Sequence, residues 1–172
     1  MKRMLCALLA GIVAIGLTAC GKTAPEPEAA EPVTEPTSAA APAEEERPEL
    51  VSYSVYVPND NADGFDVVSV ETEEISVDAV LDELKSRNIL PDGVAVNSFC
   101  VDGGLITVDF NRDFADVVCS MGTSGELMVV GSVVNSLLDA FGADTVSFTV
   151  DGQILESGHT IYDFPLSFFA LR

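Results

Sequence analysis

The sequence predicts an α+β domain in which a single mixed β-sheet of about five strands packs against two α-helices. Apolar residues recur at the spacing of one helix face over residues 125–141, and apolar and polar residues alternate directly afterwards, over residues 145–151. A hairpin signal, Asp102-Gly103-Gly104, separates two further alternating stretches. These observations favour a mixed sheet covered by the two helices.

The first expected elements are two strands and a helix. Residues 50–57 alternate apolar and polar side chains, as a strand with one buried face does. A turn over residues 58–64 and a short strand over residues 66–71 follow. Ser76 can cap a helix that ends near Arg87, where basic residues suit the helix C-terminus.

The turn also has a partial metal-binding pattern. Asn59, Asn61, Asp63 and Gly64 have the spacing that opens an EF-hand calcium loop. The twelfth position is Val70 rather than glutamate, and no helix is expected before the loop. We therefore favour a plain polar turn and predict no metal site.

The next elements are a hairpin and the long helix. Residues 94–101 and 105–110 are expected to form the hairpin strands, and residues 113–122 an irregular link. Thr123 and Glu126 have the spacing of a capping box at the start of the long helix. The predicted buried face of this helix consists of Leu127, Val130, Val134, Leu137, Leu138 and Phe141.

The long helix is expected to end at a glycine and to lead into the last strand. Gly142 suits the left-handed position after the final turn, and residues 145–151 alternate between apolar and polar side chains. Residues 154–169 then read as a strand or loop that closes the edge of the sheet. The domain therefore occupies residues 49–172.

The first 48 residues are expected to lie outside this domain. Residues 1–19 combine a basic head with an apolar run too short to span a bilayer comfortably, followed by the lipobox Leu17-Thr18-Ala19-Cys20. This stretch resembles a bacterial lipoprotein signal, which implies a diacylglyceryl group on Cys20 and a location outside the cytoplasmic membrane. The alternative is an ordinary secretory signal with an incidental cysteine. Residues 20–48 are rich in Pro, Glu and Ala and predict a disordered tether.

The charge of the domain limits its partners. Residues 49–172 carry 21 acidic and four basic side chains, giving a net charge near −17, and the whole chain has a formal charge of −20. Such a surface disfavours nucleic acid, anionic headgroups and anionic wall polymers. A basic protein partner or surface cations are favoured.

Two cysteines remain in the domain, Cys100 and Cys119. Outside the cytoplasm a disulfide between them could persist, and they could meet across the link before the long helix. Two free thiols are the favoured alternative. With no CxxC motif and no Cys/His cluster, the sequence predicts no zinc site and no cofactor.

His159 is the only histidine, so a histidine-dependent hydrolase would have to use it. It would need a nucleophile such as Ser124, or an acid such as Asp109 or Asp163. The sequence around Ser124 matches a nucleophile elbow poorly, because its second glycine falls one position early and no strand leads into the serine. We therefore predict no catalytic residue and treat His159 as a loop residue or binding candidate.

Asn135 interrupts the apolar residues of the long helix. If it is buried, its amide needs hydrogen-bond partners. It could tie the helix to the loop at Gly158 and His159, or it could lie at the solvent-exposed edge of the apolar face. A structural role is favoured over ligand contact, and Asn135 is kept as the second binding candidate.

Several stretches resemble the GerMN domain, a module named for a sporulation and germination lipoprotein. The matching motifs are Val101-Asp102-Gly103-Gly104 with Val108-Asp109-Phe110, Gly125-Glu126 with Val134-Asn135-Ser136-Leu137, and Val146-Ser147-Phe148-Thr149-Val150-Asp151-Gly152 with Gly158-His159 and Pro165-Leu166. The resemblance covers nearly all of residues 50–169. Ser136 stands where the family usually has threonine, and Cys100 and Cys119 are not part of the pattern.

The resemblance implies a binding or assembly module without known catalysis, as found in envelope lipoproteins of which some act in sporulation or germination. We therefore expect a membrane-anchored, extracytoplasmic lipoprotein whose domain binds an envelope protein or a cell-wall component. The alternatives are a peptidoglycan hydrolase that uses His159 and a lipoprotein that binds a small ligand.

Overall fold

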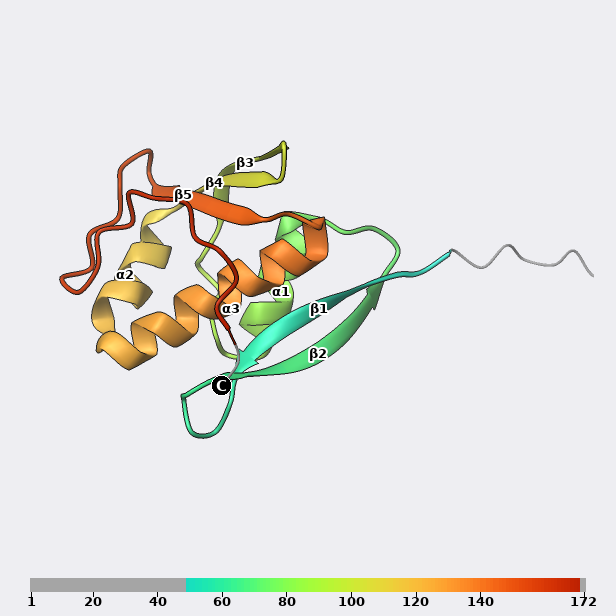
Figure 1. Ribbon diagram of the computed structural model, residues 1–172, viewed down its shortest axis with the longest axis horizontal. Coiled ribbons are helices and arrows are strands. Elements are labelled where there is room, and N and C mark those ends of the chain that lie inside the picture. The colour runs from blue at the N-terminus through green and yellow to red at the C-terminus, as the bar shows by residue number, and fades with distance from the viewer. Residues whose placement is uncertain (1–48, 171–172) are drawn as a thin grey trace, which may run out of the picture. The chain divides into compact units, whose positions relative to one another are not determined.

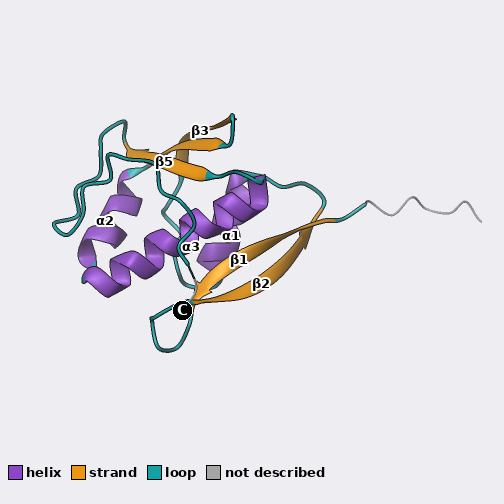
Figure 2. Cartoon of the chain, viewed as in Figure 1, coloured by secondary structure: helices purple, strands orange, loops and turns teal. Residues whose placement is uncertain are grey.

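Five strands and three helices make up residues 49–170, the part of the chain that the computed structural model describes (Figures 1 and 2). The elements are β1 (Val51–Pro58), β2 (Phe65–Thr72), α1 (Val77–Ser86), β3 (Val96–Asp102), β4 (Leu105–Phe110), α2 (Arg112–Ser120), α3 (Thr123–Phe141) and β5 (Thr145–Val150). The predicted α+β class and the five strands are confirmed. The predicted signal, the lipid site Cys20 and the tether lie outside the described residues.

The strands form two sheets rather than the single sheet expected. β1 and β2 form an antiparallel pair, and the second sheet has the order β3-β4-β5, with β3 antiparallel and β5 parallel to β4. Helix α3 runs between the two sheets (Figure 1). Its Ser136 Oγ and Asp139 Oδ1 accept the backbone N–H groups of Tyr56 (3.0 Å) and Ser54 (2.5 Å). The free edge of β1 is therefore occupied by helix side chains.

Helix α3 begins differently from the prediction. Gly122 is its N-cap and no side chain caps it, so the capping box of Thr123 and Glu126 is wrong. Glu126 instead turns inwards and is 2% exposed, whereas Leu127, predicted to be buried, is 47% exposed. Gly142 ends the helix in the left-handed conformation, as predicted.

Helix α2 occupies most of the stretch predicted to be irregular. Its buried face consists of Phe114, Ala115 and Val118. The ring of Phe114 stacks on Phe110 at 4.3 Å and meets Phe148 edge-on at 5.5 Å. The irregular link was wrong because these apolar residues cover one end of the three-stranded sheet, and packing of this kind stabilises a helix too short to persist alone.

After β5 comes a long segment, residues 151–170, without helix or strand, which runs back past β5 and across α3 (Figure 2). A single bridge pairs Leu166 with Val146 of β5, which confirms that this segment closes the edge of the sheet. Leu155, Tyr162 and Leu166 are buried in the main core. Within residues 49–170, the helices lack the combination of length and apolar composition needed to cross a membrane.

Candidate binding site

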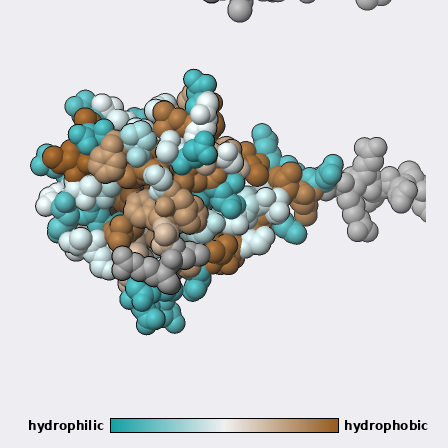
Figure 3. All heavy atoms as spheres, in the orientation of Figure 1, coloured by the Kyte–Doolittle hydropathy of each residue, from teal (hydrophilic) through white to brown (hydrophobic). Residues whose placement is uncertain are grey.

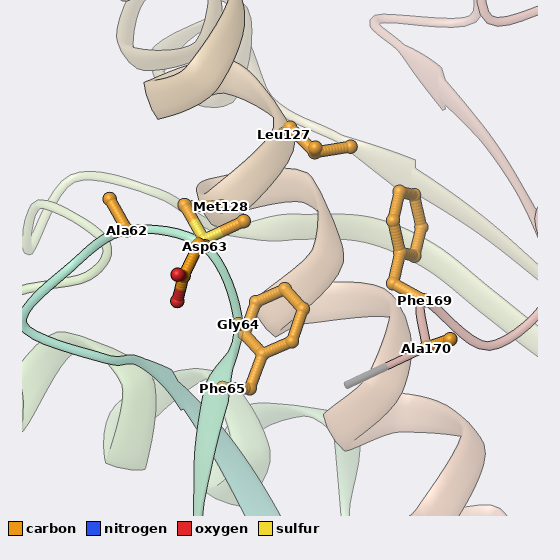
Figure 4. Close-up of a pocket in the computed structure, with 8 residues that line it drawn as sticks. All are labelled: Ala62, Asp63, Gly64, Phe65, Leu127, Met128, Phe169 and Ala170. Atoms are coloured by element: carbon orange, nitrogen blue, oxygen red, sulfur yellow. The ribbon is translucent and has the colours of Figure 1, made fainter. Parts of the chain in front are cut away.

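An apolar groove opens beside the first turns of α3. It has a volume of about 410 Å³. It is lined by Ala62, Asp63, Gly64, Phe65, Leu127, Met128, Phe169 and Ala170 (Figure 4). Three distant parts of the chain thus meet here: the β1–β2 turn, α3 and the C-terminal segment. Figure 3 shows a hydrophobic area, rimmed by hydrophilic residues, on the face that this segment crosses.

Gly131 of α3 allows two aromatic rings to approach the helix closely. A Cβ at this position would lie 2.4 Å from Cζ of Phe65 and 3.3 Å from Cγ of Phe169. Phe65 is buried with Tyr56 and Met128 in a small cluster apart from the main core, and Phe169 packs against it. The absence of a side chain at residue 131 is therefore what lets the walls of the groove form.

Asn135 fixes the position of Phe169. Its Nδ2 donates to the Phe169 carbonyl at 3.0 Å, and its Oδ1 accepts the Phe169 N–H at 2.8 Å. The residue is completely buried. The segment that Asn135 holds is at Phe169 rather than at Gly158 and His159, the loop considered from the sequence. Asn135 thus builds the groove without lining it.

We expect Asn135→Ala to lower the free energy of unfolding by about 1–3 kcal/mol, because it removes both hydrogen bonds that the buried Asn135 makes to the partly buried Phe169 backbone. Amide exchange at Phe169 should accelerate in the same variant. Urea denaturation and hydrogen exchange measure the two effects. Ser132→Ala is the matched control, since this buried hydroxyl on the same helix has no partner among residues 49–170. Equal destabilisation in the two variants would contradict the assigned role.

A second cluster surrounds the buried carboxylate of Glu126. Ser157 Oγ and Tyr162 Oη donate to Oε1 at 2.7 and 2.6 Å. His159 Nδ1 lies 2.9 Å from Oε2, and the ring nitrogen carries the proton because a carboxylate only accepts. Glu126 therefore ties three residues of the C-terminal segment to the start of α3.

The electrostatics of this cluster keep Glu126 ionised. Burial alone would raise the pKa of Glu126, but hydrogen bonds from Ser157, Tyr162 and His159, with the charge of His159, lower it overall. Burial and the adjacent Glu126 carboxylate raise the pKa of Tyr162. The tyrosine therefore remains a hydrogen-bond donor.

His159 lies at the rim of this cluster rather than in a complete catalytic site. It lines a small cavity of about 230 Å³ with Glu156, Gly158, Thr160 and Ile161. The acid beside it is Glu126, not Asp109 or Asp163 as the hydrolase alternative assumed. The Ser157 hydroxyl is committed to Glu126, and the Ser124 hydroxyl lies 3.4 Å from the Ala62 carbonyl. Neither serine hydroxyl is aimed at His159 as a nucleophile would be.

Asp109 belongs to a separate polar cluster that joins β3, β4 and β5. It accepts hydrogen bonds from Thr149 (2.5 Å) and the Gly152 N–H (2.7 Å), while Asn97 Nδ2 donates to its other oxygen (3.0 Å). The Thr149 bond, then the Gly152 bond, lower the pKa of Asp109 against a smaller opposing effect of burial. The cluster holds the three strands together at this end.

The two cysteines are free and exposed, so the disulfide considered from the sequence is not formed. Cys100 lies on the outer face of β3, because its neighbour Phe99 packs against the core on the inner face. Cys119 lies in α2, which packs beneath the inner face. The sheet itself separates them.

The polar turn of residues 58–64 is closed by hydrogen bonds between Asn59 and Asp63.

Comparisons with known proteins give a family and a fold. The family model described as Germane, sporulation and spore germination, matches residues 43–156. The tandem GerMN domains of the sporulation protein GerM from Bacillus subtilis are 15% identical at a TM-score of 0.52, covering 78% of this chain and 50% of that chain. The first GerMN domain of the same protein is 21% identical at a TM-score of 0.48, covering 68% of this chain and 97% of that chain. This chain thus spans half the length of the tandem structure. No curated protein matches the sequence.

Proposed function

Because this chain belongs to the Germane family of sporulation and spore germination proteins, we propose that it is a membrane-anchored extracytoplasmic lipoprotein whose GerMN domain is a non-catalytic binding and assembly module of the cell envelope. The lipobox that ends at Cys20 supports the anchor. The tether of residues 20–48 would let the domain reach a partner beyond the membrane surface.

The apolar groove beside α3 carries the binding role. Of its lining residues only Asp63 is titratable, so the groove has the chemistry of a contact surface rather than of a reaction site. Leu127 is almost half exposed there, an unusual position for a large apolar side chain on a helix whose next eleven residues, 128–138, are all buried. The occupant we propose is an envelope protein that inserts apolar side chains and surrounds them with basic residues, matching the acidic domain.

The anchor is tested by metabolic labelling with a fatty-acid probe. The wild-type chain should incorporate the probe and sediment with membranes. Cys20→Ala should lose both properties, because the thioether to lipid forms on the cysteine sulfur. Cys6→Ala is the matched control and should keep both. A Cys20→Ala chain that still carries label would refute the anchor.

The groove is tested by a photo-crosslinking amino acid placed at Leu127 or at Ala62, on two of its walls. We expect both positions to capture the same envelope protein in cells. A probe at the exposed Val101 of β3 should not capture that protein. Capture of the same protein from all three positions, or from none, would show that the groove is not the binding surface.

The pairing of Glu126 with His159 is the observation that keeps a hydrolase as the second candidate. An acid at Nδ1 is the arrangement that supports a histidine base, although no nucleophile accompanies it among residues 49–170. Digestion of purified cell wall by the chain, lost in His159→Ala, would favour this candidate. We expect no digestion by either chain.

A further inference from the structure

Strand β2 has an edge with no partner in the described part of the chain. It pairs along its whole length with β1, from Phe65 opposite Pro58 to Thr72 opposite Val51, without a register shift. Its other edge meets no strand among residues 49–170. Figure 1 shows β2 on the far side of β1 from α3. Val67 near its start is 51% exposed.

The hydrogen bonds of β1 show which backbone groups of β2 face outwards. In an antiparallel pair, opposite residues alternate between those that bond to each other and those that point away. The N–H groups of Ser54 and Tyr56 bond to α3, so both residues point away from β2. Their partners, Ser69 and Val67, therefore present their N–H and C=O groups to solvent.

The other strand edges of the described fold are blocked. The free edge of β1 is covered by Ser136 and Asp139 of α3. The outer edge of β5 bridges to Leu166. The outer strand β3 has a register shift between Val96 and Ser98, an irregularity that disfavours strand addition. β2 thus offers the one long regular edge in residues 49–170.

The only charged residues of β2, which could discourage another strand from pairing with its edge, are acidic. β2 contains Asp66 and Glu71 but no proline or lysine, the usual residues that prevent strand addition. Neither carboxylate forms an ion pair with any residue in the 49–170 range. The described cations are already paired on their own helices, as Lys85 with Asp82, Arg87 with Glu83 and Arg112 with Asp116, each at 3.0 Å.

The charges decide which strand can add here. A second copy of this domain would bring another net charge near −17, including its own Asp66 and Glu71, against the same edge, and this mutual repulsion opposes pairing of β2 with β2. A strand that places lysine or arginine opposite Asp66 and Glu71 would be attracted to both carboxylates.

We propose that the free edge of β2 is a strand-addition site for an extended, positively charged segment of another protein. The added strand would bond to the outward backbone groups of Val67 and Ser69 and place basic side chains beside Asp66 and Glu71. Apolar residues between them would contact the exposed Val67. This surface is distinct from the groove, so either one can fail its test while the other passes.

The probe is a short capped peptide of alternating valine and threonine, with two lysines at the spacing of Asp66 and Glu71. It is added to the full chain in a neutral detergent. We expect binding by fluorescence anisotropy. We also expect about tenfold or more slowing of amide exchange at Val67 and Ser69, whose outward N–H groups should exchange rapidly without the peptide. The same peptide methylated on its backbone nitrogens should not bind.

Ser69→Pro removes an outward N–H without removing a bond to β1, and edge strands tolerate proline at such positions. It should weaken peptide binding by roughly tenfold or more, whereas Ser69→Thr should bind as the wild type does. Joint Asp66→Asn and Glu71→Gln should weaken binding about threefold or more and reduce its salt dependence.

Three results would overturn the proposal. One is the absence of peptide binding, and another is binding that the methylated peptide or Ser69→Pro retains. The third is concentration-dependent dimerisation of the chain that protects the same two amides, which would assign the edge to a second copy. Because the methylated peptide leaves the protein unchanged, the test holds even if the proline variant unfolds.

Discussion

Glu126→Ala is expected to lower the free energy of unfolding by about 3–5 kcal/mol in urea denaturation. The substitution removes the acceptor of three hydrogen bonds and leaves the hydroxyl of the buried Tyr162 without its partner. It also detaches residues 157–162 from α3. Faster amide exchange in that loop should accompany the loss of stability.

The pH dependence of the unfolding free energy provides the control for Glu126→Ala. The folded-state pKa of Glu126 lies below its unfolded value of 4.5, so its stabilising effect is complete above that value and is lost as the pH falls through the folded pKa. Glu126→Gln keeps the shape but not the charge. The difference in unfolding free energy between wild type and Glu126→Gln should therefore shrink as the pH falls below about 4.5. A difference independent of pH would mean that Glu126 is not ionised in the folded state.

Phe114→Ala should destabilise the domain by about 3–5 kcal/mol, because it removes a fully buried ring that packs against Phe110 and Phe148. Phe114 is the largest side chain on the buried face of helix α2, so the far-ultraviolet circular dichroism should also decrease. Thermal and urea unfolding measure the first effect.

Phe164→Ala is the matched control, since it removes the same ring from a position that is half exposed. We expect it to change the free energy of unfolding by less than about 1 kcal/mol. Comparable losses in the two variants would show that the packing of α2 does not contribute as the structure implies.

Phe114 and Glu126 also show where sequence reasoning failed. The pattern around Phe114 covers barely two turns, and its helical state depends on contacts with Phe110 and Phe148 that periodicity does not reveal. Glu126 has the spacing of a capping residue, and nothing local distinguishes a cap from a buried acceptor. Its partners lie 31–36 residues further along the chain.

What could be predicted had a local signal. The long helix, its Gly142 end, the hairpin at Asp102-Gly103-Gly104 and the last strand followed from spacing and turn residues. The groove had no such signal, because Phe65, Gly131 and Phe169 meet only in the folded chain. Asn135 gave a partial signal, because a buried amide needs hydrogen-bond partners, but the sequence left open whether it was buried and did not point to Phe169.

The C-terminal segment has a consequence for the order in which the molecule forms. Leu166 and Phe169 follow every described helix and strand in the chain, yet the first is buried against β5 and the second is hydrogen-bonded to Asn135. A nascent chain that has emerged only as far as β5 lacks both contacts and leaves Phe148 without its neighbour Tyr162. Completion of the native state therefore waits until residues 155–169 have also been synthesised and can pack against β5 and α3.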